Sequence, residues 1–512
     1  MNKDSLKKRY IYKLSTNVIG GFINLFAIAL IPRALGVINF GNFNFTTTII
    51  TQFLNLLEFR TSTCFYVKVA QRPKENKLVL FYSLFTMLLF LVLIVLITGI
   101  VFSPFRKFVF QDQESIIIIY SLILVILTWV LELFVKIMDA HGATVPLEKM
   151  RIVNKVLGVL LLLVLLFSNR LDLNNYFYYQ YFLLLILLYY LYRYLKRNNY
   201  LTFESSLSKR DFISYFKEFY SYSGPLGLYV ILQFVHIAFD RWILQYYGGG
   251  FQQGIYSFSF AISSVCLLFT VTMIPLFTRE LSEAAGENSI EKMAKLYRLF
   301  VPMLYAITGY FCCFIFVESK SIIQLFGGTE YETAELTLKI LSFYPLISVY
   351  SNLNGSVIYA NGRTSFVLKL ALIFTPLSMI TTWLLLNNGY WGFNLGAEGL
   401  AVKEIILELI SVVIFVYVNT DFLKLRFRNY LVHMIFSILP FIIFAYSAHF
   451  IVHWICNGFN FSSNTIILFF ISGVVYSLFS LLIVWIYPMV FGLSRKDISS
   501  QIDTLFKRLD QK

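Results

Sequence analysis

The stretch PRALGVINFGNFNFTTTII, residues 32–50, contains two glycines five positions apart, of which Gly36 is the first, followed by aromatic residues that alternate with small polar ones. The stretch LQYYGGGFQQGIYSFSFAI, residues 244–262, has two glycines at the same spacing, beginning with Gly249, and aromatic residues at the same offsets. The two glycines that begin these patterns are 213 residues apart (249 − 36). The chain therefore contains an internal repeat.

The composition decides the class of protein in which this repeat occurs. Hydrophobic residues make up 58% of the 512 residues, charged residues only 14%, and the mean hydropathy is +0.71. Soluble proteins usually contain about 25% charged residues, and one soluble core could not bury this much apolar surface. Segments such as LLFLVLIVLITGIVF are apolar on every side and do not alternate, which excludes a β-barrel. The sequence therefore predicts an all-α polytopic membrane protein.

A membrane-crossing helix needs about 20 mostly apolar residues, and we expect fourteen such helices. The expected spans are 13–32, 42–66, 79–102, 116–138, 150–168, 176–195, 218–246, 252–277, 297–317, 335–359, 365–386, 397–419, 430–455 and 465–490.

Lysine and arginine are concentrated in every second connection between these spans, and at both ends of the chain. Because cytoplasmic loops are enriched in these residues, both termini are expected to be cytoplasmic. The net charge of +14 follows mostly from this pattern and favours contact with anionic lipids, so no nucleic-acid partner is expected. The five cysteines lie in or beside apolar runs without a C-x-x-C motif, and neither a metal nor a cofactor is predicted.

The repeat predicts two lobes. The first copy joins spans one and two, and the second joins spans seven and eight, so that six spans separate the copies and both enter the membrane in the same orientation. Parallel repeats of this kind build transporters whose substrate path lies between the lobes. We expect a lobe at 1–205, a lobe at 206–423, and a third segment at 424–512 with spans thirteen and fourteen and an amphipathic cytoplasmic tail. Residues 279–298 are expected to form a cytoplasmic surface helix. The alternative is that glycines and aromatics recur at helix starts by chance.

Several motifs resemble those of a known family. IPRALGVINFGNFNF (31–45) is similar to the first-loop signature of polysaccharide repeat-unit flippases, the Wzx-type proteins of the multidrug/oligosaccharidyl-lipid/polysaccharide exporter superfamily. FDRWILQYYGGGFQQGIYSFSFAI (239–262) resembles their signature at spans seven and eight. Further similar segments are MIPLFTREL (273–281), IIQLFGGTEYETAELTLKIL (322–341), YANGRTSFVLKL (359–370) and GFNLGAEGLAVKE (392–404). Glu398 and Gly399 depart from the family pattern, in which Gly-Ala-Ala is frequent.

The resemblance implies a MATE-like fold and a flippase activity. Such a protein moves undecaprenyl-pyrophosphate-linked oligosaccharide across the bacterial cytoplasmic (inner) membrane by alternating access, for O-antigen or capsule synthesis. The implied partners are this lipid-linked oligosaccharide, membrane lipids, and a polysaccharide polymerase and chain-length regulator.

Charged residues inside a membrane cost about 2.5–3.5 kcal/mol on insertion scales and therefore indicate function. Arg60 is a candidate for substrate binding, because a guanidinium binds pyrophosphate oxygens in a bidentate manner. Glu58, two positions earlier, would point about 200° away on a regular helix and is a candidate for ion coupling. The alternative for Arg60 is a structural ion pair near the cytoplasmic end of the span.

Gln233, His236 and Asp240 are spaced to form one polar stripe on span seven. The stripe is either a hydrogen-bonded seam between helices or a proton or cation relay, because histidine titrates near neutral pH. Arg241 points about 100° away from Asp240 and is a second candidate for binding the substrate anion.

Two further groups of charged residues are candidates for gating or binding. Glu132, Lys136 and Asp139 follow one helix face, where Glu132 and Lys136 either neutralise each other or form part of a cytoplasmic gate. In span twelve, Glu404 is a candidate for ion coupling and Lys403 for substrate binding. Arg33, at the outer end of span one, either meets the headgroup or extends to lipid phosphate.

Two other functions remain open. An enzyme such as a membrane glycosyltransferase or polymerase would need a polar domain outside the bilayer, but the longest predicted outer connection has about 17 residues (318–334), and no Walker A, G-x-S-x-G or H-E-x-x-H motif occurs. We therefore do not expect an enzyme. A multidrug/cation antiporter of the same superfamily would need an acidic cation site in the first lobe, where the early spans offer only Glu58 and Glu132.

Overall fold

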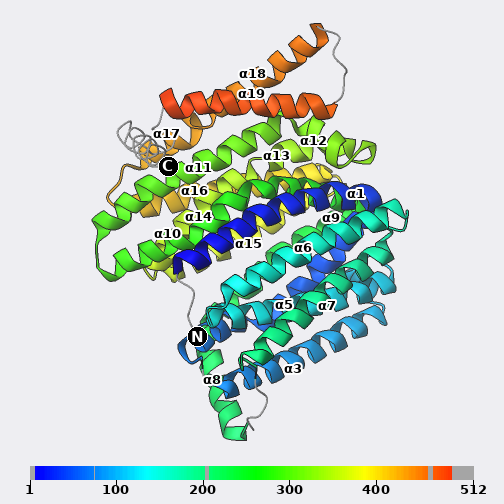
Figure 1. The fold of residues 1–512 in the computed structure, drawn as a ribbon, viewed down its shortest axis with the longest axis vertical. Coiled ribbons are helices and arrows are strands. Elements are labelled where there is room, and N and C mark those ends of the chain that lie inside the picture. The colour runs from blue at the N-terminus through cyan, green and yellow to red at the C-terminus, as the bar shows by residue number, and fades with distance from the viewer. Residues whose placement is uncertain (1–5, 74, 202–206, 459–464, 487–512) are drawn as a thin grey trace, which may run out of the picture. The chain divides into compact units, whose positions relative to one another are not determined.

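The computed structural model describes residues 6–73, 75–201, 207–458 and 465–486. Every regular element in these ranges is a helix (Figure 1), which confirms the all-α prediction. Nine of the described helices are long and apolar enough to cross a membrane.

The first helices are α1 (Leu6–Glu58), α2 (Thr61–Gln71), α3 (Asn76–Val101), α4 (Arg106–Val109), α5 (Ser115–Ala140), α6 (Thr144–Phe167), α7 (Leu173–Arg197), α8 (Lys209–Ser223), α9 (Gly227–Ser264) and α10 (Leu268–Gly286). They are followed by α11 (Ile290–Val317), α12 (Ser319–Phe326), α13 (Glu335–Leu341), α14 (Tyr344–Ala360), α15 (Thr364–Leu386), α16 (Gly396–Phe422), α17 (Phe427–Phe436), α18 (Leu439–Gly458) and α19 (Thr465–Ile486). Short 3-10 helices lie at Gly224–Leu226, Val265–Leu267 and Thr329–Ala334.

The predicted number of fourteen spans stays a prediction. Two of the nine candidate segments, Ser15–Glu58 and Lys209–Leu267, have 44 and 59 residues and each covers two predicted spans. Helices α7, α14 and α16 occupy three further predicted spans but are not among the nine candidate segments.

The helices form two compact units, each of which combines two stretches of the chain. The first unit comprises residues 1–257 and 371–400, and the second comprises residues 258–370 and 401–512. The lobes predicted from the sequence are continuous stretches, and their boundaries stay a prediction.

The first unit is built around the second half of α1. Phe45 and Ile49 of α1 share a buried apolar cluster with Leu93 of α3 and Ile118 of α5, and Ala238 of α9 packs against this cluster. A neighbouring cluster joins α2, α3 and α8 around Tyr82, whose ring stacks on Phe65 with 4.2 Å between centroids. These contacts hold the end of α1 and the middle of α9 in fixed positions within the unit.

The second unit has a core formed by α10, α11, α14, α16 and α17. Its centre is polar as well as apolar, since the buried Tyr297 hydroxyl donates to Asn354 Oδ1 at 2.8 Å. Helices α18 and α19 pack on α11 through a smaller cluster that includes Phe441 and Tyr476. The Tyr476 hydroxyl donates to the Tyr310 carbonyl at 2.8 Å, so the last helix pair belongs to the packed structure of this unit.

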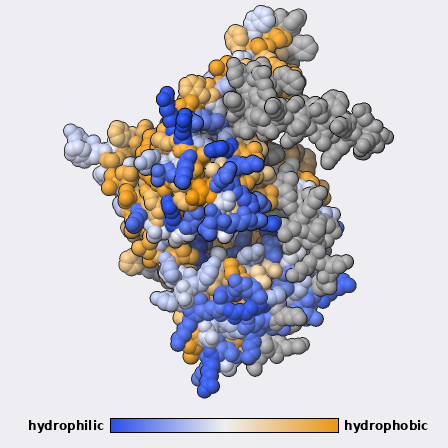
Figure 2. Space-filling view, turned by 90° about the vertical axis from the view of Figure 1, so that its left-hand side faces the viewer, coloured by the Kyte–Doolittle hydropathy of each residue, from blue (hydrophilic) through white to orange (hydrophobic). Residues whose placement is uncertain are grey.

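Large apolar side chains cover the outside of several helices, as expected for surfaces that face lipid. On α3 the exposed side chains are Leu84, Met87, Leu88, Leu91 and Val95, and on α19 they are Phe470, Val474, Leu478 and Leu481. Hydrophilic side chains gather on the face that includes the connection from α10 to α11 (Figure 2). The chain is a multi-pass membrane protein.

Both copies of the repeat break a helix at the first glycine. The backbone of α1 leaves helical geometry at Gly36, with φ 75° and ψ 164°, and α9 does so at Gly249, with φ 60° and ψ −166°. This region of backbone space is open almost only to glycine. The predicted spans leave connections at 33–41 and 247–251, whereas each break takes a single residue.

Two other expectations are wrong or lie outside the described residues. Residues 279–298 do not form one surface helix, because α10 ends at Gly286 and α11 begins at Ile290. Ser289 ends the intervening turn and accepts a hydrogen bond from the Lys292 backbone N–H at 3.2 Å. The predicted amphipathic tail lies outside the described residues.

Candidate functional site

The candidate site lies in the first unit, where the break between α1 and α2 faces α9. Phe59 and Arg60 join the two helices with φ of 52° and 61°. Left-handed backbone costs a non-glycine residue about 1–2 kcal/mol, and such strain tends to occur at functional sites. The predicted continuous span at 42–66 is therefore interrupted at the two residues that precede α2.

Glu58 stabilises this break. Its buried carboxylate accepts hydrogen bonds from the Arg60 backbone N–H at 3.1 Å, from the Thr61 hydroxyl at 3.4 Å, and from the Ser62 backbone N–H. It thereby satisfies free N–H groups at the start of α2, where a negative charge is also favoured by the helix dipole. The predicted separation of about 200° between Glu58 and Arg60 is wrong, because it applies only to an unbroken helix and the helix breaks at Phe59 and Arg60.

The same break projects the Arg60 side chain towards α9. Its guanidinium donates a hydrogen bond to Gln233 Oε1 at 2.9 Å. The side chain is exposed, and no carboxylate oxygen of the described residues lies within 4.0 Å of it. A guanidinium has five N–H donors, so most of the Arg60 donors are available to a ligand.

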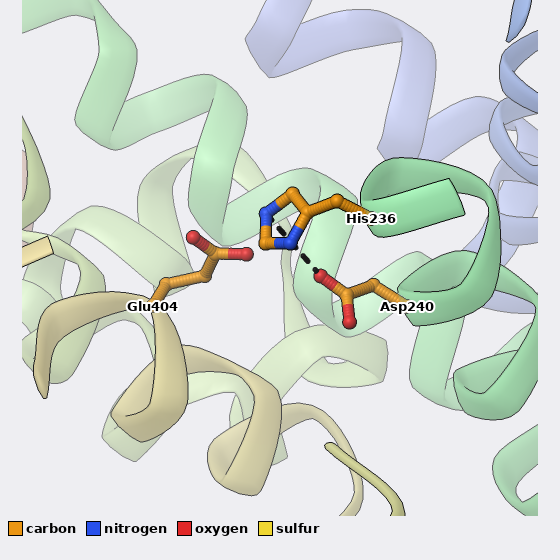
Figure 3. Close-up of side chains that lie close together, drawn as sticks. All are labelled: His236, Asp240 and Glu404. Atoms are coloured by element: carbon orange, nitrogen blue, oxygen red, sulfur yellow. Dashed lines mark ion pairs between the residues drawn. The ribbon is translucent and has the colours of Figure 1, made fainter. Parts of the chain in front are cut away.

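The polar stripe on α9 continues from Gln233 as the spacing predicted. His236 Nε2 lies 3.8 Å from Asp240 Oδ2 (Figure 3). Asp240 is 5% exposed, and its Oδ1 accepts a hydrogen bond from the Thr382 hydroxyl at 2.6 Å. Arg60, Gln233, His236 and Asp240 therefore form one polar track from α2 along α9, with a permanent cation at one end and a carboxylate at the other.

Arg241 is held within α9. Its guanidinium donates to Gln253 Oε1 and to the Ser257 hydroxyl at 3.3 Å each, and it lies 4.5 Å from the ring centre of Tyr256. Gln253 in turn donates to the Arg241 carbonyl. These contacts bridge the break at Gly249, so Arg241 fixes the angle between the two halves of α9.

The second glycine of each repeat is in contact with the other repeat. A Cβ added to Gly41 would lie 1.9 Å from the Gly250 carbonyl oxygen, and one added to Gly254 would lie 2.1 Å from the Val37 carbonyl oxygen. Since real Cβ atoms do not approach backbone so closely, only glycine fits at either position. The repeat predicted from the sequence is therefore a pair of broken helices that cross at their glycines.

The charged residues of α5 do not form the Glu132–Lys136 ion pair that the sequence suggested. Lys136 lies within electrostatic range of Glu58, Glu132 and Arg60, but Glu132 is exposed and the two side chains of Glu132 and Lys136 are farther apart than the 4.0 Å of an ion pair. Asp139 accepts a hydrogen bond from the Thr144 hydroxyl at 2.9 Å. Lys136 thus adds positive potential near Arg60, and Asp139 fixes the turn into α6.

The remaining predicted site residues are Arg33, Lys403 and Glu404. Arg33 is exposed in the first unit. Lys403 and Glu404 belong to the second unit, where the fully buried Lys403 ammonium forms an ion pair with Glu404 at 3.1 Å; Figure 3 also labels Glu404. The roles assigned to these residues stay predictions.

Sequence reasoning missed the hydroxyl and amide partners of the track. Thr382 lies in the apolar run SMITTWLLL, and nothing local distinguishes it from a threonine that bonds its own helix. Outside the track, Gln252 accepts a hydrogen bond from the Ala397 backbone N–H at 2.8 Å, and these two residues are 145 positions apart in the sequence.

Comparison with solved structures establishes the fold. The chain is similar to the lipid II flippase MurJ in an inward closed conformation, with a TM-score of 0.62, 13% sequence identity, and coverage of 93% of this chain and 98% of that chain. It is also similar to an inward-facing multidrug resistance MATE family transporter of the MOP superfamily, with a TM-score of 0.60, 14% identity, and coverage of 81% and 94%.

A third similar structure is a MOP superfamily transporter from Pyrococcus furiosus, with a TM-score of 0.58, 16% identity, and coverage of 82% and 97%. No protein-family model and no curated protein sequence matches the chain. The chain therefore has the fold of these transporter structures, which confirms the predicted MATE-like, all-α fold.

Proposed function

We propose that this protein is a flippase that moves an undecaprenyl-pyrophosphate-linked oligosaccharide repeat unit across the bacterial cytoplasmic membrane for surface polysaccharide synthesis. The observation that carries the proposal is the Arg60 guanidinium. It is exposed, it is held in place by Gln233 at 2.9 Å, and no carboxylate of the described residues neutralises it. A pyrophosphate needs such a cation inside the membrane, where an unpaired charge is otherwise costly.

The polar track suits a substrate with a charged head and an apolar tail. The pyrophosphate would bind Arg60, with Lys136 adding positive potential, while the sugars meet the hydrogen-bonding groups of Gln233 and His236. The polyprenyl tail can remain in the lipid, because only the head must cross. We place both termini in the cytoplasm, and a polysaccharide polymerase and a chain-length regulator are the proposed partners that use the product.

The extent of the structural similarity supports a lipid substrate. A coverage of 93% corresponds to about 476 of the 512 residues, so the similarity to the lipid II flippase extends beyond residue 423, where the two predicted six-span lobes end. The coverage of 81–82% by the MATE-type structures corresponds to no more than about 420 residues. Part of the segment after residue 423 thus has a counterpart in the lipid II flippase, whereas the MATE-type structures cover a smaller share of the chain.

A multidrug/cation antiporter is the second candidate, and one observation favours it. Asp240 is a buried carboxylate beside a histidine on the polar track, and such a pair can bind and release a proton or cation during transport. The pair is also compatible with an ion-coupled flippase. The chemical class of the substrate therefore decides between the two candidates.

The test compares Arg60→Gln with Arg170→Gln, a matched loss of one positive charge in an exposed loop. Both variants and the wild type are placed in vesicles with a labelled pyrophosphate-linked oligosaccharide, and the fraction that reaches the opposite leaflet is measured by enzymatic access. We expect Arg60→Gln to slow translocation about 10- to 100-fold, since hydrogen bonds to charged groups contribute about 1.5–3 kcal/mol, and Arg170→Gln to have no effect. Normal translocation by Arg60→Gln, or drug efflux without lipid translocation, would contradict the proposal.

A further inference from the structure

A second cationic site lies in the second unit, in a pocket of about 480 Å³. The pocket is formed by α11, by the connection between α16 and α17, and by the first turns of α17. Its volume lies within the range of about 300–1,000 Å³ that is common for small-molecule sites. Its lining residues are Arg298, Pro302, Lys424, Leu425, Arg426, Asn429, Tyr430 and His433.

The lining of this pocket is positively charged without compensation. Arg298, Lys424 and Arg426 carry permanent charges, and no carboxylate of the described residues lies within 4.0 Å of any of them. The nearest acid along the connection is Asp421, whose backbone oxygen accepts a hydrogen bond from the Lys424 N–H at 3.1 Å and whose exposed side chain is not part of the lining. Three like charges around one pocket repel one another, and an anion would relieve that repulsion.

The connection between α16 and α17 has a strained backbone at one of these cations, Lys424. Lys424 has φ 56°, a left-handed conformation that glycine usually takes after the end of a helix. The neighbouring Leu425 N–H donates to the Thr420 carbonyl at 2.7 Å, which closes the end of α16. A lysine in this conformation lowers the stability by about 1 kcal/mol relative to glycine. Unlike glycine, it contributes a cationic side chain to the pocket lining.

The pocket also lies at a boundary between membrane and water. Arg298 and Pro302 lie in the first half of the candidate span Ile290–Val317, and the candidate span Phe427–Cys456 begins directly after Arg426. The two helices are in contact, since the rings of Tyr297 and Tyr430 meet edge to face with 5.1 Å between centroids. Leu425 and Pro302 give the pocket an apolar wall beside its cations. Basic pockets between helices at the cytoplasmic surface are typical sites for anionic lipid headgroups.

We infer that this pocket binds the phosphate of an anionic phospholipid, with Arg298 and Arg426 as its main ligands, Lys424 as a third cation, and the acyl chains directed into the bilayer beside α11 and α17. Arginine suits this role because its planar donors bind phosphate oxygens in pairs. The inference does not depend on the proposed transport function, because none of these residues belongs to the polar track of the first unit.

The test measures the affinity of the purified full-length protein for short-chain phosphatidylglycerol and, separately, for short-chain phosphatidylcholine, by thermophoresis in detergent. The pocket variant is Arg298→Gln with Arg426→Gln. The control variant is Lys295→Gln with Arg428→Gln, which removes one charge from α11 and one from α17 at residues that do not line the pocket. We expect the wild type and the control to prefer phosphatidylglycerol, and the pocket variant to bind it at least tenfold more weakly.

Three outcomes would overturn the inference. The wild type could bind both lipids equally, the two double variants could lose affinity equally, or inorganic pyrophosphate could bind to the pocket while phosphatidylglycerol does not. The last result would identify a soluble phosphate ligand in place of a lipid. If the pocket double variant does not give a monodisperse protein, the single variant Arg426→Gln on the exposed connection replaces it, with Arg428→Gln as its control and the same expected direction.

Discussion

The two copies of the repeat have the same backbone and different side chains. In each copy the first glycine permits a break, at Gly36 and Gly249, and the second permits close contact with the other copy, at Gly41 and Gly254. The side chains before the breaks differ, because Arg33 is exposed whereas the second copy carries a fixed polar stripe. The glycine break and the glycine contact thus occur in both copies. The candidate transport residues lie only in the second copy and at the break between α1 and α2, which carries Arg60.

The largest effect is expected at the crossing. In Gly254→Ala the new Cβ would lie 2.1 Å from the Val37 carbonyl oxygen, and backbone on both sides would have to move. We expect a loss of stability of about 3 kcal/mol, at the upper end for overpacking, measured by thermal unfolding in detergent. The control is Gly99→Ala in α3, where a Cβ meets nothing within 4 Å and helix propensity favours alanine by up to about 1 kcal/mol. Equal melting temperatures for the two variants would show that the crossing is not tight.

The breaks themselves allow a direct test of equivalence. Gly36→Ala and Gly249→Ala each place an alanine at positive φ with extended ψ, at a cost of order 1–3 kcal/mol. Because a Cβ on Gly249 meets nothing within 4 Å, that cost is conformational and not steric. We expect both variants to lower the melting temperature by similar amounts. A large loss for one and none for the other would mean that the two breaks are not equivalent.

The two arginines of the site should separate function from stability. Arg241→Gln removes two hydrogen bonds of 3.3 Å and a contact with the Tyr256 ring, and we expect it to lower stability by about 1–2 kcal/mol. Arg60→Gln removes one exposed hydrogen bond and should change stability by less than about 0.5 kcal/mol, while it slows translocation. The measurement is thermal unfolding and vesicle translocation on the same preparations. If Arg60→Gln lowered stability and Arg241→Gln slowed translocation without loss of stability, Arg241 would be the transport residue and Arg60 the structural one.

The sequence predicted the class, the helices and the repeat, because these depend on local hydropathy and on glycine spacing. It also predicted the His236–Asp240 pair, since both residues lie on one helix. It did not predict the break at Phe59 and Arg60, because no glycine or proline marks it and Glu58 stabilises it by bonds to the next helix. The Arg60–Gln233 and Thr382–Asp240 contacts join residues 173 and 142 positions apart, and one sequence contains no information about such pairs.

A second histidine–carboxylate pair provides the smallest and most specific comparison. His449 of α18 lies 2.8 Å from Glu318 Oε1 at the end of α11, closer than the 3.8 Å between His236 and Asp240. Burial raises the pKa of Glu318, but the hydrogen bonds from His449 and Ser321 outweigh it and hold the pKa below its usual value of 4.5. A carboxyl group with a depressed pKa stabilises the fold above its unfolded pKa, and that contribution is lost as the pH falls through the folded pKa.

We therefore expect the melting temperature of the wild type to fall more steeply below pH 4.5 than that of Glu318→Gln, which cannot titrate at this position. At pH 7 the variant should be less stable by about 1 kcal/mol, a value reduced from that of a fully buried pair because His449 is partly open to its surroundings, and its translocation rate should be unchanged. Asp240→Asn, in contrast, should slow translocation if the pair on α9 couples to an ion. If Glu318→Gln and Asp240→Asn both lower stability and neither slows translocation, the stripe on α9 is a seam between helices. The two copies of the repeat then differ only in packing.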